Sequence, residues 1–322
     1  MRYFITGGTG LIGAYTTWRL IAAGHEVVIY DISPDRVFLQ ELIGEDAAKV
    51  RCVAGDITDL PFLLRTMQEA APDRVIHLAA LLGAKSEENL YRSLEVNCTG
   101  CLNIFEAALA CNVARVVWAS SVAVFGPRHR RVGLEGALPN DALHDPNIIY
   151  GACKSLSERF SLHYRRNRGL DILGLRFALV YGYGKDRTLA RGTGGDFLTQ
   201  LIDNPALGKA GRIPAGDAVI DFVYAEDAAE AVVRACEASD NRAVAVNVTG
   251  FRTTLRDAAA TVRAIVPDAQ LEVEDGSWKG TIHHYDATSA EREIGYAARW
   301  GIEEGFRHNI EEVRARAAQS VR

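Results

Sequence analysis

The sequence lacks any apolar run that approaches the length of a membrane-spanning helix, and it lacks a block of basic residues. A spanning helix needs about 20 consecutive apolar residues, so none is predicted. Lys and Arg number 36 against 41 Asp and Glu, which gives a net charge of -5. Because nucleic acids and anionic membranes attract basic patches, this scattered charge argues against both as partners.

Cysteine is scarce, and its six positions (52, 98, 101, 111, 153 and 236) lack the spacing of a disulfide framework. Reduced thiols, and hence a cytoplasmic protein, are the simplest interpretation. The segment Arg2–Ile5 predicts a strand and not a signal peptide. Cys98 and Cys101 form a C-x-x-C on a predicted helix without a second pair, which favours packing over metal binding. No metal site is expected.

Apolar residues make up 48% of the 322 residues, enough for a large core. In the first half, short apolar runs alternate with helical stretches. The expected strands are 3–6, 26–30, 50–54, 74–78, 115–119 and 171–177, and the expected helices are 11–23, 59–70, 86–111 and 146–167. Strands and helices that alternate in this way predict a parallel sheet covered on both faces.

After about residue 181 this alternation ends, and Gly and Pro become frequent from 182 to 216. Short strands at 243–248 and 271–274 mix with helices at 226–238, 255–266 and 302–317. We therefore expect an α/β fold, a Rossmann-type doubly wound parallel sheet with a smaller C-terminal α/β substrate lobe. The expected domains are residues 1–180 and 181–322. The second domain is either separate from the first or interleaved with it.

A glycine-rich loop, GGTGLIG at residues 7–13, follows the first expected strand and opens the first helix. Glycine lets the backbone turn tightly and approach a pyrophosphate, and the helix N-terminus offers N–H groups and a positive dipole end. Turn or packing glycines could have the same spacing. Here strand, loop, helix, second strand and a terminal carboxylate occur together. The loop predicts dinucleotide binding by Gly7, Gly10, Leu11, Ile12 and Gly13.

Two aspartates follow the next expected strands. Asp31 ends the second strand, where a carboxylate accepts hydrogen bonds from the adenosine ribose and repels a 2′-phosphate, which favours NAD over NADP. The alternative is that Arg36 neutralises such a phosphate. Asp56 follows the third strand, where its side chain can reach the adenine, although a helix cap is the alternative for Asp56.

Tyr150 and Lys154 lie one turn apart on an expected helix and so face the same way. A free tyrosine has a pKa of about 10 and is a poor base at neutral pH. A nearby cation stabilises the phenolate, which can then take a proton from a substrate hydroxyl. Ser120 and Ser121 end the fifth strand, at the sheet edge where ligands bind. A strand-end turn serine is the alternative, and it suits Ser120 better than Ser121.

With these residues in hand, the chain resembles the extended short-chain dehydrogenase/reductase family, also called the NAD-dependent epimerase/dehydratase family. The resemblance covers almost the whole chain. Its motifs are TGGTGLIG at 6–13, Asp56-Ile57, HLAA at 77–80, Asn97, SSVAVFG at 120–126, the Tyr/Lys pair, Arg176-Phe177 and DFVY at 221–224.

The resemblance implies NAD as cofactor and Ser121, Tyr150 and Lys154 as catalytic residues, with Lys154 also holding the nicotinamide ribose. It implies further cofactor contacts, namely Asp56, Ile57, Leu78, Ala79, Ala80, Asn97, Phe177 and Val180. Family members often form homodimers by packing two long helices into a four-helix bundle. The corresponding helices here are 86–111 and 146–167.

Three positions depart from relatives that act on nucleotide-diphosphate sugars. Leu179 replaces a common asparagine, and Ile220 and Ile282 replace arginines that grip the diphosphate. Apolar side chains cannot replace charge-assisted hydrogen bonds, so a smaller substrate is favoured. Lys185, Arg187 and Arg191 could meet a carboxylate, with a solvated loop as the alternative. His283 and His284 could face the same pocket.

The leading hypothesis is an NAD-dependent dehydrogenase that moves hydride between NAD and a hydroxyl or keto carbon of a small sugar-like or hydroxy-acid substrate. The alternative is a nucleotide-sugar 4-epimerase-like enzyme with tightly held cofactor. Dehydration is disfavoured because Val122-Ala123 stands where dehydratases of the family often carry Asp-Glu. A cofactor-sensing scaffold is the rival from another class, and the intact Ser121/Tyr150/Lys154 set argues against it.

Overall fold

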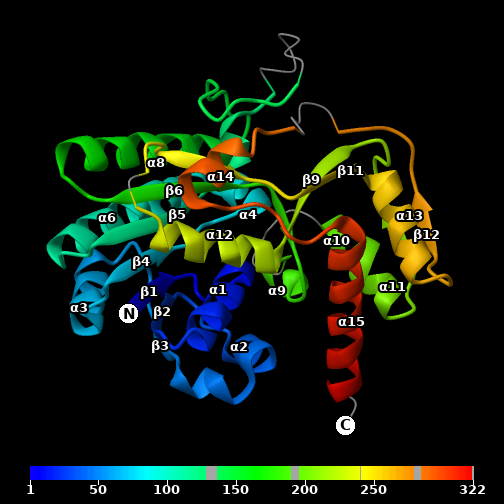
Figure 1. Ribbon diagram of the computed structural model, residues 1–322, viewed down its shortest axis with the longest axis horizontal. Coiled ribbons are helices and arrows are strands. Elements are labelled where there is room, and N and C mark those ends of the chain that lie inside the picture. Colours follow the sequence, from blue (N-terminus) through cyan, green and yellow to red (C-terminus); the bar gives the residue numbers. More distant parts are fainter. Residues whose placement is uncertain (128–135, 190–195, 240, 279–283, 321–322) are drawn as a thin grey trace.

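The computed structural model describes residues 1–127, 136–189, 196–239, 241–278 and 284–320. Its centre is a seven-stranded parallel sheet with the strand order β3-β2-β1-β4-β5-β6-β10 (Figure 1). The strands are β1 (Arg2–Thr6), β2 (Glu26–Asp31), β3 (Arg51–Ala54), β4 (Arg74–His77), β5 (Arg115–Ser121), β6 (Ile172–Phe177) and β10 (Ala245–Val248). The sheet confirms the expected doubly wound α/β fold.

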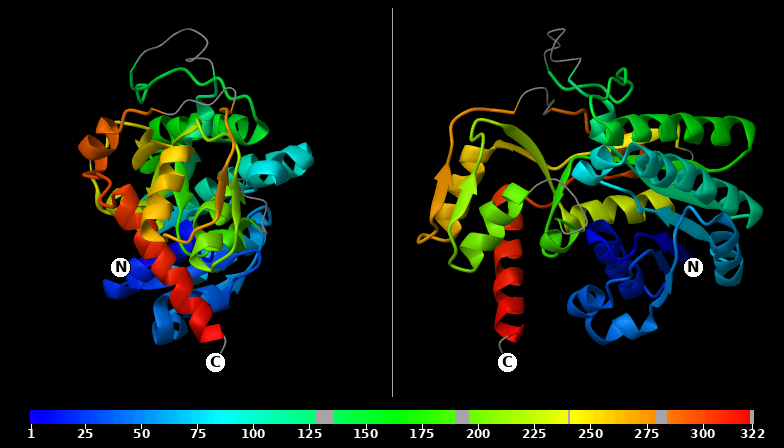
Figure 2. Two further views of the ribbon diagram at one scale, coloured as in Figure 1. Left: turned by 90° about the vertical axis from the view of Figure 1, so that its right-hand side faces the viewer. Right: turned by 180° about the vertical axis from the view of Figure 1, so that it is seen from behind.

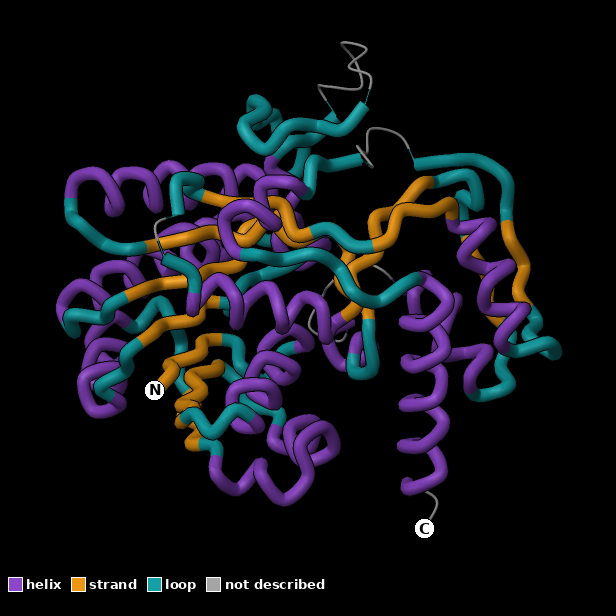
Figure 3. Tube along the Cα trace, viewed as in Figure 1, coloured by secondary structure: helices purple, strands orange, loops and turns teal. Residues whose placement is uncertain are grey.

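The chain moves outward from β1 to β3 and then returns to β4 on the other side of β1. In sheets of this kind ligands bind beyond the carboxyl ends of the strands, at the point where the strand order reverses. Helices cover both faces, so that the strands lie between two helical layers (Figure 3). The fold therefore directs attention to the ends of β1 and β4.

Side-chain alternation along the strands forms two cores. Ile5, Ile29 and Ile76 are in register across β2, β1 and β4 and point to one face, which α1 (Leu11–Ala22) and α12 (Ala225–Glu237) cover. Phe4 and Val28 point to the other face. That face is covered by α3 (Leu60–Ala70), α6 (Gly100–Ala110) and α8 (Ile149–Asn167). Both cores are mainly apolar, as expected for a parallel sheet buried on its two faces.

A smaller lobe lies at one end of the sheet (Figure 2). It contains a three-stranded sheet of β7 (Leu179–Tyr181), β9 (Val219–Tyr224) and β11 (Phe251–Thr254), and a pair of β8 (Gly211–Ile213) with β12 (Leu271–Val273). The helices α13 (Leu255–Ile265) and α15 (Ile302–Ser320) pack with these strands around a third apolar core. Shorter elements are α9 (Lys185–Leu189), α10 (Asp196–Leu198), a π-helix (Thr199–Asp203) and α11 (Asn204–Ala206).

The second half of the chain contributes to both parts of the molecule. The strand β10 pairs with β6 in the central sheet, α12 packs beside α1, and α14 (Thr288–Ile294) packs against β10. The expected boundary at residue 180, between a cofactor-binding domain and a substrate-binding lobe, therefore remains a proposal. In space, segments after 181 complete the sheet that segments before 180 begin.

One expected helix is wrong as a continuous element. Residues 86–111 lie in α4 (Gly83–Glu88), α5 (Leu90–Leu94), a π-helix (Glu95–Thr99) and α6. The break falls at Asn89, whose backbone is extended and whose side chain accepts a hydrogen bond from the Arg92 N–H, so that Asn89 caps α5. The expected helix 146–167 begins only at Ile149. In the first half of the chain, α2 (Arg36–Ile43) and the 3-10 helices Gly44–Lys49 and Val122–Val124 were also not expected.

Candidate active site

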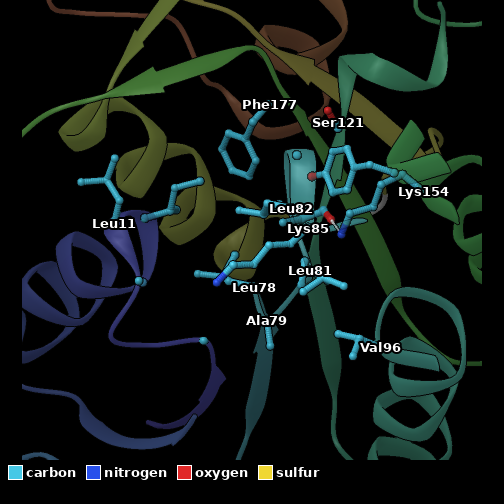
Figure 4. Close-up of a pocket in the computed structure, with 18 of the residues that line it drawn as sticks. Leu11, Leu78, Ala79, Leu81, Leu82, Lys85, Val96, Ser121, Lys154 and Phe177 are labelled. Atoms are coloured by element: carbon cyan, nitrogen blue, oxygen red, sulfur yellow. Dashed lines mark hydrogen bonds between the residues drawn. The ribbon is translucent and has the colours of Figure 1, made fainter. Parts of the chain in front are cut away.

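A cavity of about 750 Å³ opens beyond the carboxyl ends of the central strands. It extends from the ends of β2 and β3, past the glycine loop, to the end of β5 and the start of α8. Figure 4 shows Leu11 on one side of the cavity and Ser121 and Lys154 on the other. The expected site residues that line it are Gly7, Gly10, Leu11, Ile12, Gly13, Asp31, Asp56, Ile57, Leu78, Ala79, Ala80, Ser121, Tyr150, Lys154, Phe177 and Val180.

The glycine loop has the geometry that a pyrophosphate needs. Gly7 has a φ of +69°, and a Cβ there would lie 2.7 Å from the Ala79 nitrogen. A Cβ on Gly13 would collide with the Gly7 carbonyl oxygen. The helix α1 starts directly after this loop, without a side-chain cap and without an acidic residue in its first turn. Its N-terminal N–H groups and dipole are therefore available to an anionic ligand.

Asp31 lies at the carboxyl end of β2 and is held by its neighbours. One carboxylate oxygen accepts a hydrogen bond of 2.7 Å from the Thr9 hydroxyl, and the other accepts one from the Ser33 N–H at 3.1 Å. These bonds fix the carboxylate beside the glycine loop, at the place where a ribose hydroxyl is expected. Arg36, the alternative partner for a 2′-phosphate, begins α2 and is not among the residues that line the cavity.

Asp56 also lines the cavity, and it is not the cap of the following helix. The cap of α3 is Asp59, which accepts from the Phe62 N–H. Asp56 instead accepts from the Thr58 N–H at 2.9 Å and from Arg92 at 2.5 Å. Burial tends to raise the pKa of Asp56, but the hydrogen bonds from Thr58 and Arg92 outweigh burial and lower it.

The HLAA segment is positioned by two buried polar residues. The Nδ1 atom of His77 lies 2.7 Å from the Thr6 hydroxyl, and burial lowers the pKa of His77 to about 3, so this side chain is neutral. Asn97 was expected near the cofactor, but it is not among the residues that line the cavity. Its side chain accepts from the Leu81 N–H and donates to the Leu81 carbonyl, both at 2.9 Å. Asn97 therefore holds the loop that lines the cavity.

The Tyr/Lys pair lies at the start of α8. The Lys154 ammonium is buried, donates to the Ala119 carbonyl at 2.6 Å, and lies 5.6 Å from the centre of the Tyr150 ring. Burial lowers the pKa of Lys154. Burial raises the pKa of Tyr150 to about 12, although a hydrogen bond with the Ser121 side chain acts in the opposite direction. Ser121 ends β5 and accepts from the Ala123 N–H.

Ser120 points into a buried ionic network that sequence reasoning missed. Its hydroxyl donates to Glu158 at 2.6 Å, and Arg176 donates to both carboxylate oxygens of Glu158 at 2.7 Å. Arg176 also donates to the Asn140 carbonyl at 2.6 Å, and the His144 Nε2 atom lies 3.5 Å from Glu158. The network joins β5, β6 and α8 to the segment before α8. Its sequence signal was the spacing of Glu158, one turn after Lys154.

The side chains around the catalytic end are mostly apolar. Leu82, Ile148, Phe177 and Leu179 line the cavity there. Two further lysines, Lys85 and Lys185, also line the cavity. Ile220 lies in the core of the smaller lobe and is not among the lining residues. Arg187 is held by ion pairs with Asp35 at 3.2 Å and Glu41 at 2.6 Å, so it is not available to a substrate carboxylate in this arrangement.

Four further observations concern the remaining expectations. His284 is exposed and does not line the cavity, while Arg191, Ile282 and His283 lie outside the described residues. Cys98 and Cys101 are buried, and all six cysteines are free thiols. Within the described part of the chain, no group of three His, Cys, Asp or Glu residues is arranged to hold a metal ion. No helix of that part is long and apolar enough to cross a membrane.

Comparison with known proteins gives this geometry a context. A probable UDP-glucuronate 4-epimerase of Rhizobium meliloti (strain 1021) is 30% identical over 242 residues, which cover 73% of this chain and 67% of that protein. The crystal structure of a Thermus thermophilus UDP-glucose 4-epimerase in complex with NAD is 26% identical, with a TM-score of 0.83 over 98% of this chain and 99% of that one.

A GalE-like L-threonine dehydrogenase from Cupriavidus necator in its holo form has a TM-score of 0.80 at 22% identity, over 98% of this chain and 99% of that one. That likeness shows the fold alone. The glycine loop, in which Gly7 and Gly13 leave no room for a Cβ, and the uncapped N-terminus of α1 fit a dinucleotide. NAD is the cofactor of the family. Residues 3–249 match the model of the NAD-dependent epimerase/dehydratase family. The chain therefore belongs to this family and is an NAD-dependent enzyme of the extended short-chain dehydrogenase/reductase type.

Proposed function

We propose that the protein is an NAD-dependent dehydrogenase of a small sugar-like or hydroxy-acid substrate. The observation that carries this proposal is the apolar catalytic end of the cavity, where Leu179 stands in the wall and Ile220 is buried in the neighbouring core. A nucleotide-diphosphate substrate requires charge-assisted hydrogen bonds for its phosphates. Neither of these two residues can supply such bonds.

In this proposal, the site would hold NAD, and bound NAD would supply the means to exchange a hydride with the substrate carbon. Glycines 7, 10 and 13 and the start of α1 hold its pyrophosphate, and Asp31 accepts from the ribose of its adenosine half. Lys154 holds the other ribose. Tyr150 exchanges a proton with the substrate oxygen, and Ser121 donates a hydrogen bond to that oxygen. Support for this division of roles comes from the position of Ser121 and Tyr150 in the lining of the same cavity, and from the Ser121 side chain, which opposes the rise of the Tyr150 pKa.

We further propose a cytoplasmic homodimer that acts in carbohydrate metabolism. Six free cysteines suit a reducing compartment. Support for the dimer comes from α5 and α8, which pack against each other and expose four large apolar side chains. These side chains, called here the apolar helix face, are Leu90, Tyr91, Leu94 and Leu156. A second copy of this face would bury them in a four-helix bundle.

A second candidate function is a nucleotide-sugar 4-epimerase-like activity with tightly held cofactor. It is favoured by the similarity to the Rhizobium meliloti protein, a probable UDP-glucuronate 4-epimerase that aligns over 73% of this chain. An epimerase would use the same proton and hydride transfers but return the hydride before the cofactor leaves. Net reduction of added NAD would then be absent.

The two candidates are separated by NADH absorbance with excess NAD and a panel of free sugars, sugar acids and UDP-sugars. We expect stoichiometric reduction with a free sugar or sugar acid. The matched control is Tyr150→Phe, which should slow the appearance of this signal by about 10²- to 10⁴-fold. A change of configuration in a UDP-sugar without net NADH would overturn the dehydrogenase proposal in favour of the epimerase.

A further inference from the structure

The end of the cavity farthest from Tyr150 contains an arginine that no expected contact accounts for. The strand order places the ends of β2 and β3 on one side of β1 and the end of β5 on the other. In the proposed binding of NAD, Tyr150 and Lys154 contact the nicotinamide end and the glycine loop contacts the pyrophosphate. The adenine end then lies beside Asp31 and Asp56. Arg92 lines the cavity together with these two aspartates.

The Arg92 guanidinium is fixed between two carboxylates. It donates to Asp56 at 2.5 Å and to Glu95 at 3.0 Å from two different nitrogens. Its backbone is fixed as well, because the Asn89 side chain accepts from the Arg92 N–H at 2.9 Å and caps α5. The two ion pairs leave the planar group few orientations, so it forms a rigid part of the cavity wall.

A guanidinium held in this way suits a purine ring. Guanidinium groups stack on aromatic faces, are less strongly hydrated than ammonium groups, and lose little freedom when they are already held in place. Asp56 supplies the complementary acceptor for an exocyclic amino group. One of its oxygens accepts from the Thr58 N–H and the other from Arg92, and a carboxylate oxygen can accept two bonds.

We propose that Arg92 is an adenine-binding residue, which packs its guanidinium plane against the purine of NAD while it orients Asp56 to accept from the adenine amino group. Both residues then act on the adenosine half of the cofactor alone. The inference depends on the direction in which NAD lies in the cavity. It is independent of whether the reaction is a dehydrogenation or an epimerisation, because binding can be measured without substrate.

The test is the dissociation constant of NAD, measured by isothermal titration calorimetry on the purified wild-type protein and the variants Arg92→Ala and Arg92→Lys. AMP is measured on the same proteins by displacement of NADH fluorescence. We expect Arg92→Ala to weaken both NAD and AMP by about tenfold, the range of a desolvated cation–π contact. Arg92→Lys should stay weakened because an ammonium restores the charge without the planar surface.

The matched control is Arg168→Ala, which removes an arginine that also pairs with a carboxylate, Glu106, and lies over a ring, Tyr164. Arg168→Ala should bind NAD as the wild type does. The melting temperature of each variant shows whether weaker NAD binding comes from a lost contact with the ligand or from loss of the folded structure. An Arg92→Ala variant that is folded and binds NAD within twofold of wild type, or that weakens NAD without weakening AMP, would overturn the proposal.

Discussion

At the residue scale, the protonation of Tyr150 in the free protein differs from what its spacing suggests. A lysine one turn away is expected to lower the tyrosine pKa. In the structure the Lys154 ammonium donates to the Ala119 carbonyl and lies over the Tyr150 ring. Burial then dominates and raises the pKa of Tyr150 to about 12. The free protein should therefore keep Tyr150 protonated at neutral pH, and Tyr150 must lose this proton before it can accept one from a substrate hydroxyl.

A spectroscopic titration tests this protonation state. The pKa of Tyr150 is raised above the ordinary 10, so its phenolate appears only as the pH rises toward about 12. We expect the tyrosinate difference spectrum of wild type minus Tyr150→Phe to stay flat up to pH 10 in the absence of NAD. A titration with a midpoint near pH 7 in that spectrum would show that Lys154 controls the hydroxyl in the free protein as well.

Removal of the Tyr150 hydroxyl should affect catalysis and leave cofactor binding intact. Positioned proton transfer contributes about 10²- to 10⁴-fold in rate, so Tyr150→Phe should lower kcat by that range. The NAD dissociation constant should change less than threefold, because the ring and Lys154 remain. The control is Tyr91→Phe, whose ring is 88% exposed on α5. A Tyr150→Phe enzyme with wild-type kcat would contradict the assigned role of Tyr150.

At the element scale, Glu158 and Arg176 hold the ends of β5 and β6 and the middle of α8 in one arrangement. The carboxylate accepts two bonds from Arg176 and one from Ser120, the neighbour of Ser121. Arg176 in turn donates to the Asn140 carbonyl, in the segment that leads to α8 and Tyr150. The relative positions of Ser121 and Tyr150 thus depend on a buried ion pair that touches neither.

Neutralising this ion pair should destabilise the protein strongly. Glu158→Gln leaves the buried Arg176 without a counter-charge, which typically costs about 3–5 kcal/mol of unfolding free energy. The control is Glu69→Gln, which removes the exposed pair with Arg51 and should cost less than about 1 kcal/mol. Urea denaturation followed by circular dichroism measures both. Equal losses for the two variants would mean that Arg176 finds another partner when Glu158 is neutral.

The sequence predicts those features that rest on local patterns and misses those that rest on distant partners. The glycine loop, the strands of the central sheet and the Tyr/Lys pair each have a local signature. Arg92 has none, because its partner Asp56 is 36 residues away. Asn89 breaks the expected helix 86–111 by a capping bond, which a helical pattern of apolar residues does not reveal.

The same limit applies to roles. Asn97 belongs to the family pattern, and sequence alone assigned it to the cofactor. In the structure, the Asn97 side chain forms hydrogen bonds with the backbone of Leu81, a residue that lines the cavity. Leu179 lines the cavity, whereas Ile220 lies in the core of the smaller lobe. These positions depend on β7 and β9, which pair in a second sheet that the sequence did not predict.

At the scale of the whole molecule, the proposed oligomeric state rests on the apolar helix face. Leu90, Tyr91, Leu94 and Leu156 are 41–88% exposed on two helices that pack together, although the sheet beneath them is fully buried. Large apolar side chains gathered on one face commonly mark a protein interface. Burial in a second copy would remove them from water, at about 25 cal/mol per Å² of apolar area. The proposed homodimer follows from this face.

Charge placed in that face should dissociate the dimer. A Tyr91→Glu/Leu94→Glu variant would bring two carboxylates from each copy into an apolar contact, where their desolvation is unfavourable. We expect the wild type to have twice the chain mass in size-exclusion chromatography with light scattering, and the variant to have the chain mass with an unchanged circular dichroism spectrum. The control is Phe251→Glu, which changes an exposed apolar residue on β11 in the other lobe and should remain a dimer. A monomeric wild type at micromolar concentration, or a variant that stays dimeric, would place the interface elsewhere or remove it.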